Sequence, residues 1–341
     1  MLGKELLKTF DAAFMLTQIH RSAEDSWWTE SCLRLRDYSM DYWYDYQYWM
    51  QHDLRRGNLT EEEKKHFDEK AVWLCARCEK VGSRNGRKLA KLAEDNNSMI
   101  HKINARHSNH LSAKRKSSSE YGGLRHVLHL SRGCKVVLTR NVAYLYGLAN
   151  GTRGKLISIV YSPDAVPGDF PEALIVDFPD YKGPAIYAER PTWVPILPKL
   201  TYKEKSAMWR EQFPLTPGFA MTINKSQGLT LSEGIVVDLE GSQRYKPASK
   251  HGLAFVAFTR STSFENTAFS NLPAFDEFKK GLRSDMLRMR QAFIDQLMVM
   301  HQRTLAACSD MKTPEDEWRA AEQWMQKQEK KKCATSSSAA T

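Results

Sequence analysis

Hydrophobic spacing in the first part of the chain is typical of helices around one short strand. From Lys4 to about Leu54, apolar and aromatic residues recur every three or four positions, which predicts mostly helix. The charged stretch Glu61 to Lys70 and the stretch Ser83 to Ala93 are also predicted to be helical. Between them, Ala71 to Cys75 (AVWLC) is continuously apolar and predicts a short buried strand. A strand followed by a helix is the order that a parallel α/β sheet requires.

The middle of the chain is rich in short β-type segments. The polar stretch Ser112 to Gly123, with KRKSSS at its centre, indicates an exposed loop. After it, apolar and β-branched segments alternate with clusters of Gly, Pro, Asp and Asn, and we expect a small barrel of about five strands. The predicted strands are Lys135–Thr139, Lys155–Tyr161, Ala173–Phe178 and Thr192–Ile196.

Three more apolar segments follow: Phe219–Thr222, Gly234–Leu239 and Leu253–Phe258. The runs IVVDL and LAFVAF in the last two are apolar almost throughout, which predicts central strands covered on both faces. Beyond Phe275 the spacing is helical again. The low-complexity tail CATSSSAAT predicts disorder.

Composition points to a polyanionic partner. The chain has 341 residues, enough for two domains, and its 50 Lys and Arg against 40 Asp and Glu give a net charge of +10. Such a charge favours nucleic acid, although an ordinary basic surface gives the same value. No apolar run approaches the roughly 18 residues of a membrane span, and the amphipathic start MLGKELLKTFDAAF is not a secretory signal. We therefore expect an intracellular protein without a membrane partner, nuclear or mitochondrial in a eukaryote and otherwise cytoplasmic.

Cysteine spacing gives little reason to expect a metal. Of the six cysteines, Cys75 and Cys78 form a CxxC pair, but a structural zinc site needs a second pair of Cys or His ligands. None stands out, so we predict no metal site and treat the pair as incidental to a strand.

One loop has residues suited to phosphate. The strand ending at Thr222 runs into INKSQG, a polar loop of small residues whose amides and hydroxyls could bind phosphate oxygens. A plain connection that needs Gly228 for its turn would look the same. With its lead-in, however, the segment RxQFPLxPxxAxTINKSQGLTL at 210–231 resembles motif V of the RecD/Pif-like superfamily-1 DNA helicases. The family usually has histidine at the position of Asn224, and asparagine can still donate a hydrogen bond.

That resemblance assigns roles along the loop. It implies that one group of residues contacts the DNA backbone and that the end of the loop approaches the nucleotide. The implied DNA-binding residues are Thr222, Asn224, Lys225 and Ser226, and the implied nucleotide-binding residues are Gln227 and Gly228.

Two arginines resemble the family's phosphate-binding cations. The string FVAFTR ending at Arg260 is similar to motif VI, which makes Arg260 the candidate arginine finger for the charge that develops during phosphoryl transfer. A structural arginine at a strand end is the alternative. Near the N-terminus, LTQIHR ending at Arg21 resembles the segment where the first motor domain continues into the second, and it implies that Arg21 is a second catalytic cation.

The resemblance covers roughly residues 10 to 270. Val72–Leu89 is similar to the first strand and helix of the second motor domain, and Gly133–Leu156 to the hairpin of a small inserted β domain. It implies an α/β fold: a RecA-like parallel sheet domain with an inserted SH3-like β-barrel and helical terminal segments. The expected division is 1–70 helical connector, 71–125 and 211–275 second RecA-like domain, 126–210 barrel, 276–330 C-terminal helices and 331–341 disordered tail.

The sequence contains no GxxxxGK[ST] motif to cradle the nucleotide phosphates. We therefore predict the C-terminal motor portion of an ATP-dependent 5′-to-3′ type DNA helicase, which translocates on single-stranded DNA and unwinds duplexes. It would be inactive without a P-loop-bearing N-terminal motor half that holds ATP and Mg²⁺ in the intact protein. Two alternatives stay open: a non-catalytic single-stranded nucleic-acid-binding module derived from a helicase, and an inert structural relic.

Overall fold

The computed structural model describes residues 9–10, 12–16, 19–37, 42–108, 116–241, 247–276, 284–307 and 322. The chain divides into two compact units, one of residues 1–18 with 282–341 and one of residues 19–281. The first contains the helix α9, Ser284–Ala307, and its Thr304 hydroxyl accepts a hydrogen bond from the Ala13 N–H at 3.1 Å. All predicted site residues belong to the second unit. Among the described helices, none combines the length and the apolarity that a membrane crossing needs.

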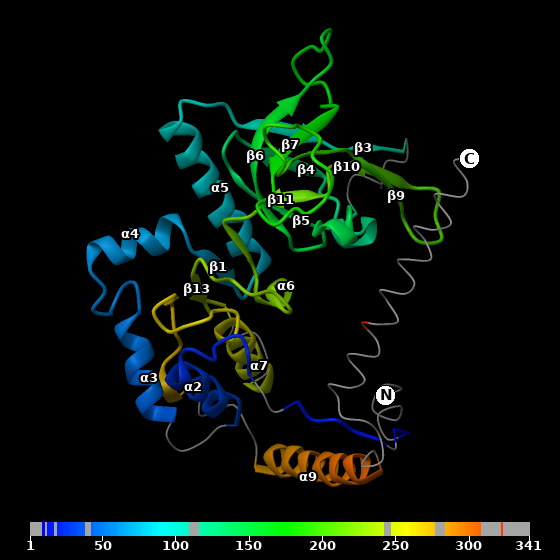
Figure 1. Cartoon of the computed structure of the whole chain (residues 1–341). Coiled ribbons are helices and arrows are strands. Elements are labelled where there is room, and N and C mark those ends of the chain that lie inside the picture. The colour runs from blue at the N-terminus through cyan, green and yellow to red at the C-terminus, as the bar shows by residue number, and fades with distance from the viewer. Residues whose placement is uncertain are drawn as a thin grey trace. The chain divides into compact units, whose positions relative to one another are not determined.

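A four-stranded parallel sheet in the second unit has helices on both faces (Figure 1). Alternation along β1 decides what each face contacts: Val72 and Leu74 belong to a core cluster with α7, whereas Trp73 and Cys75 belong to one with α5. Both faces are covered, so every residue of β1, β13 and β14 is buried. This sheet confirms the predicted α/β class. Its strand order is β12 (Ala220–Thr222), β1 (Val72–Cys75), β13 (Ile235–Asp238) and β14 (Thr267–Ser270), with α5 at Cys78–Asp95 and α7 at Pro247–Phe258.

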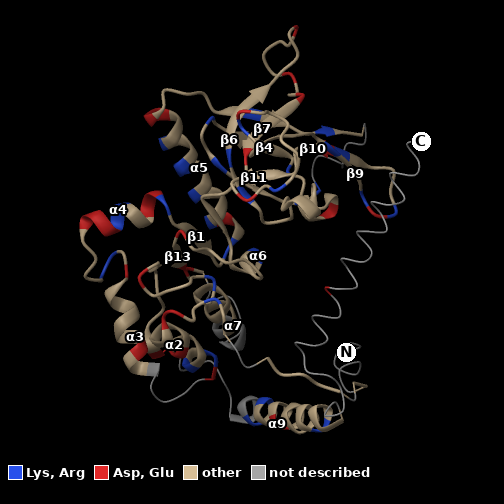
Figure 2. Cartoon of the chain, viewed as in Figure 1, with Lys and Arg blue, Asp and Glu red and all other residues tan. Residues whose placement is uncertain are grey.

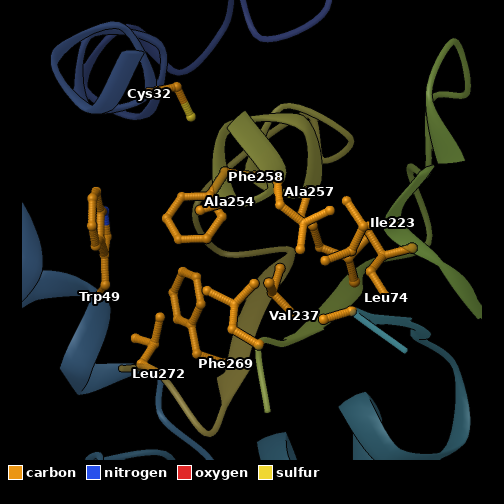
Figure 3. Close-up of a cluster of buried hydrophobic side chains, with 14 of the residues drawn as sticks. Cys32, Trp49, Leu74, Ile223, Val237, Ala254, Ala257, Phe258, Phe269 and Leu272 are labelled. Atoms are coloured by element: carbon orange, nitrogen blue, oxygen red, sulfur yellow. The ribbon is translucent and has the colours of Figure 1, made fainter. Parts of the chain in front are cut away.

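The larger core cluster holds the sheet and the N-terminal helices together (Figure 3). The ring of Phe258 on α7 lies 5.0 Å from Trp49 on α3 and 5.0 Å from Phe269 on β14, measured between ring centroids. The indole N–H of Trp49 donates to the Ser31 hydroxyl on α2 at 3.0 Å. The aromatic residues of the N-terminal segment therefore form much of this core. The helices are α2 (Ser26–Asp37), α3 (Tyr42–Gln51) and α4 (Glu61–Glu69).

The prediction of a strand at Leu253–Phe258 is wrong. This run is the second half of helix α7, and β14 takes the sheet position beside β13. Ala254, Ala257 and Phe258 are fully buried, at the i, i+3, i+4 spacing of a helix, whereas Phe255 and Val256 are half-buried. A short segment that is apolar throughout is compatible with a buried helix and with a buried strand, because either element can have apolar residues on both faces.

The small β part contains a five-stranded antiparallel sheet. Four of its strands coincide with the predicted ones within a few residues. Its edge strand β11 and the strand β2 both pair with strands of this part, although the sequence assigned residues 215–217 and 101–104 to the RecA-like domain. Closure as an SH3-like barrel and the domain boundaries stay predictions. The sheet order is β11 (Leu215–Pro217), β5 (Lys135–Leu138), β6 (Arg153–Val160), β7 (Ala173–Asp177) and β8 (Trp193–Ile196).

Shorter elements extend this part. The strand β2 pairs with β4, and β10 pairs with β3 and β9. The predicted tail at 331–341 and residues 112–115 of the predicted polar loop lie outside the described residues. The bounds are β2 His101–Asn104, β3 Arg106–His107, η1 Ser118–Tyr121, β4 Val127–Leu130, η2 Tyr144–Tyr146, β9 Lys199–Tyr202 and β10 Trp209–Gln212.

Candidate functional site

The loop INKSQG, residues 223–228, which we call the motif-V-like loop, begins where β12 ends. Thr222 has an extended conformation and precedes α6, Ile223–Ser226, which is a single helical turn. Gly228 has φ +90°, a left-handed conformation that glycine adopts without strain. The Leu229 N–H donates to the Ser226 carbonyl at 2.9 Å. The chain therefore makes one helical turn, reverses at Gly228 and returns to the sheet.

The loop exposes only some of the side chains predicted to contact DNA. Asn224 and Lys225 are exposed, and Thr222 is half-buried. Ser226 is completely buried, and its hydroxyl donates to the Ile223 carbonyl at 2.7 Å. In this conformation Ser226 closes the helical turn, which does not fit a direct contact between its side chain and DNA.

A groove of about 520 Å³ runs beside the exposed face of this loop. We call it the loop groove. It is lined by Asn224, Lys225 and Gln227 on the side of the parallel sheet. The opposite side is lined by the small β part, including Thr139, Asn150, Gly151 and Pro217. The groove thus combines one cation with amide, hydroxyl and backbone groups, a set suited to a phosphodiester backbone.

Arg21 and Arg260 meet in a second depression of about 270 Å³, which we call the arginine pocket. Arg21 donates from Nε to the Thr230 hydroxyl at 2.9 Å and from Nη1 to the Thr259 carbonyl at 2.8 Å. The structure therefore brings together two predicted catalytic residues that are far apart in the sequence.

Arg260 connects the end of α7 to the motif-V-like loop. Its Nε donates to the Val256 carbonyl at 2.8 Å, and its Nη2 donates to the Thr259 hydroxyl at 2.9 Å. From Nη1 it donates to the Leu229 carbonyl at 3.2 Å. With only 8% of its surface exposed, Arg260 has few N–H groups left for a ligand. Binding an anion fully would require exchanging at least one of these carbonyl contacts.

The arginine pocket is positively charged: Arg21, Arg36 and Arg260 line it, and none of its described lining residues is acidic. Within the described part of the chain, neither Arg21 nor Arg260 forms an ion pair with a carboxylate. Burial, and next the charge of Arg21, lower the pKa of Arg260 to about 10. The guanidinium group of Arg260 remains protonated at neutral pH, so the pocket attracts an anion.

The other two predicted nucleotide-binding residues lie outside this pocket. Gln227 lines the loop groove beside Lys225, and Gly228 is exposed at the turn. Their contact with a nucleotide stays a prediction. Leu229, whose carbonyl accepts from Arg260, also lines the loop groove, so this residue connects Arg260 to the groove.

The CxxC cysteines differ in environment. Cys75 is buried in β1, and burial, with a smaller effect of Asp238, raises the pKa of its thiol to about 12. A thiol that stays protonated is a poor metal ligand and a poor nucleophile. Cys78 is exposed at the start of α5. Among the residues that the structure describes, no group of three or more Cys, His, Asp and Glu could hold a metal ion.

Sequence reasoning missed the two threonines that hold Arg21. Thr230 lies in the segment that resembles motif V and Thr259 in the string that resembles motif VI, but the resemblance assigned neither of them a role. It also treated the Asn150–Gly151 turn only as part of a hairpin, whereas these residues line the loop groove. A contact across the tertiary fold leaves no local signal in the sequence.

A family model described as the 2B domain of the DNA helicase Pif1 matches residues 121–159. A curated relative, an ATP-dependent DNA helicase Pif1 of Bdellovibrio bacteriovorus, is 28% identical over 221 residues. That alignment covers 62% of this chain and 44% of the relative, so the chain spans less than half of that protein's length.

Solved structures have the same fold. The crystal structure of the Pif1 helicase from Candida albicans matches with a TM-score of 0.60 at 21% identity, over 82% of this chain and 60% of that one. The Pif1 helicase from Bacteroides in complex with ADP-AlF3 and ssDNA matches with a TM-score of 0.53 at 18% identity, over 82% and 56%. Together with the sequence matches, they confirm the predicted resemblance to the Pif1-like helicases of superfamily 1.

Proposed function

From this resemblance to the Pif1-like superfamily-1 helicases, we propose that the chain is the C-terminal motor portion of an ATP-dependent DNA helicase of the 5′-to-3′ type. It couples ATP hydrolysis to movement along single-stranded DNA and to duplex unwinding. One observation carries the proposal: Arg21 and Arg260 of the arginine pocket donate hydrogen bonds to Thr230 and Leu229, and Leu229 also lines the loop groove. Phosphate chemistry and strand binding can therefore act on the same few residues.

The geometry suggests how the two events are coupled. A phosphate bound to Arg21 and Arg260 would compete for the N–H groups of these arginines with the present acceptors, the Thr230 hydroxyl and the Leu229 carbonyl. Releasing these contacts frees the segment that follows Asn224 and Lys225. The loop can then shift along the strand as the nucleotide is bound and hydrolysed.

ATP and Mg²⁺ belong to the intact protein in this proposal. The two unneutralised arginines fit the nucleotide phosphates, and they would stabilise the charge that spreads over the γ-phosphate oxygens during transfer. The sequence has no P-loop motif, so a P-loop-bearing motor half would hold the β- and γ-phosphates and the metal ion.

The test is an Arg260→Ala variant of the chain, supplied with a P-loop-bearing motor half. We expect the DNA-stimulated ATP turnover to fall by roughly 10³, the scale of a lost arginine finger, with strand affinity largely kept. An Arg55→Ala variant is the control, because Arg55 is exposed and lies outside both depressions. Because Arg260 is buried, thermal unfolding of both variants must show that they fold. Unchanged turnover in a folded Arg260→Ala protein would rule out its assigned role.

A second candidate function is a non-catalytic module that binds single-stranded nucleic acid in the loop groove, and the exposed Asn224 and Lys225 that line this groove favour it. It predicts salt-dependent strand binding, as the motor does, but no ATP turnover with any P-loop-bearing half. Turnover that depends on Arg260 excludes the module.

A further inference from the structure

A third depression, of about 310 Å³, lies between α5 and β4, away from the arginine pocket. We call it the helix pocket. Gly82 and Gly86 line it from α5, and Arg125, Val127 and His129 line it from β4 and the residues before it. Pro217, on β11, lines both this pocket and the loop groove. The helix pocket is thus a neighbour of the proposed DNA groove.

Strand periodicity gives the pocket its polar wall. Arg125, Val127 and His129 are alternate residues, so their side chains leave the strand on the same side, while Leu128 and Leu130 on the opposite side are fully buried. The wall therefore presents one arginine and one histidine on an otherwise apolar surface.

Two glycines keep the opposite wall open. Gly82 and Gly86 are one turn apart in the interior of α5, where glycine is a poor helix former. A Cβ atom added at either position would meet no atom within 4 Å. Both residues are helical, so neither needs a left-handed backbone. Packing within the chain thus gives no reason for glycine here, whereas a ligand that fills the pocket would.

Arg125 is a half-buried cation without a carboxylate partner among the described residues. Across the described ranges it makes no hydrogen bond or ion pair, in contrast to Arg84 on α5, which pairs with Asp68 at 2.6 Å. Burial lowers the pKa of Arg125, and burial with the nearby Lys102 and Arg125 charges lowers that of His129. Figure 2 shows further basic positions along α5. A desolvated cation of this kind is stabilised by an anion from outside the chain.

We propose that the helix pocket binds a backbone phosphate of the single strand that occupies the loop groove. Arg125 provides the charge-assisted hydrogen bonds, His129 provides a further donor, and the two glycines leave room for the phosphate. The proposal rests on the proposed function, because it extends the DNA path past Pro217. It adds a contact that the motif resemblance does not assign.

The experiment measures binding of a fluorescent oligothymidine to the full chain over a range of salt concentrations. Each lost phosphate contact makes the negative slope of log Kobs against log salt shallower by about 0.7 for a single strand. We expect this decrease in Arg125→Gln, and also in Gly86→Leu, which fills the pocket and keeps the charge. Arg132→Gln is the matched control, because Arg132 is exposed, lies beside β4 and does not line the pocket.

Three outcomes would overturn the inference. If Arg125→Gln matches Arg132→Gln while Lys225→Ala weakens binding, the pocket is not on the strand path, and the proposed function survives. If the wild-type chain binds no strand even at low salt, both fail. If inorganic phosphate binds the wild type but not Arg125→Gln, and strand binding is equal in both arginine variants, the pocket serves a separate phosphate compound.

Discussion

Buried polar residues in this chain serve different purposes. Asn85 is buried and makes two hydrogen bonds to one residue: its Nδ2 donates to the Ala220 carbonyl at 3.0 Å, and its Oδ1 accepts from the Ala220 N–H at 2.8 Å. It therefore fastens α5 to β12, the strand that leads into the motif-V-like loop. Arg125 and Arg260 are charged, buried to different degrees and lack a carboxylate partner within the described residues, which makes them suited to ligands instead.

Asn85→Ala tests the fastening role. The change leaves the buried Ala220 N–H and carbonyl without partners, which should lower the free energy of unfolding by about 2–4 kcal/mol. Urea unfolding of the purified chain measures it. Asn96→Ala is a suitable comparison, since Asn96 lies exposed at the end of the same helix, and it should cost less than about 0.5 kcal/mol. Equal effects would show that Asn85 does not hold β12 in place.

At the level of elements, the positions of Thr259 and Arg260 depend on helix α7 and on the loop before β13. The helix ends at Phe258, so the following Thr259 and Arg260 lie at its C-terminal end, where their contacts reach the loop. The prediction of a strand at Leu253–Phe258 was wrong about how this segment packs, but it still placed Arg260 just after the end of the element. Had the run been a strand, its alternation would have put Ala254, Val256 and Phe258 on one face.

Two phenylalanines on α7 distinguish the helix from a strand. Phe258 is fully buried against Trp28, Trp49 and Phe269, so Phe258→Ala should cost about 3–5 kcal/mol of unfolding free energy. Phe255 is half-buried and lines the arginine pocket, so Phe255→Ala should cost clearly less. Thermal or chemical unfolding compares them. A larger loss at Phe255 would contradict the observed helix face.

For the molecule as a whole, the net charge of +10 does not say where a polyanion binds, because many of the cations are paired with nearby carboxylates. Many basic residues are neutralised locally, such as Arg84 and Lys88 around Asp68. Lys225, by contrast, projects into the loop groove beside residues from three distant parts of the sequence. Overall charge brings a polyanion to the protein, and the groove selects the position at which it binds.

Binding of a single strand should therefore depend more on the position of each cation than on the total charge of the chain. Lys225→Ala should reduce the salt dependence of single-strand binding by about one phosphate, a slope change of about 0.7. Lys65→Ala removes the same charge from an exposed position on α4 and should leave the slope unchanged. Fluorescence anisotropy at several salt concentrations measures both, and equal slopes would assign binding to net charge alone.

The sequence by itself determined the parallel strands at Val72–Cys75, Ala220–Thr222 and Ile235–Asp238, the strand-rich middle part and the resemblance to the helicase family. Each of these rests on local patterns: apolar runs, turn residues and contiguous motifs. Tertiary structure alone decided that Leu253–Phe258 is helical, that Ser226 is buried and that Arg21 meets Arg260. It also placed Gly86 opposite the unpaired Arg125. These facts depend on which distant segments pack together, and the free energy of such packing is not written in the spacing of neighbouring residues.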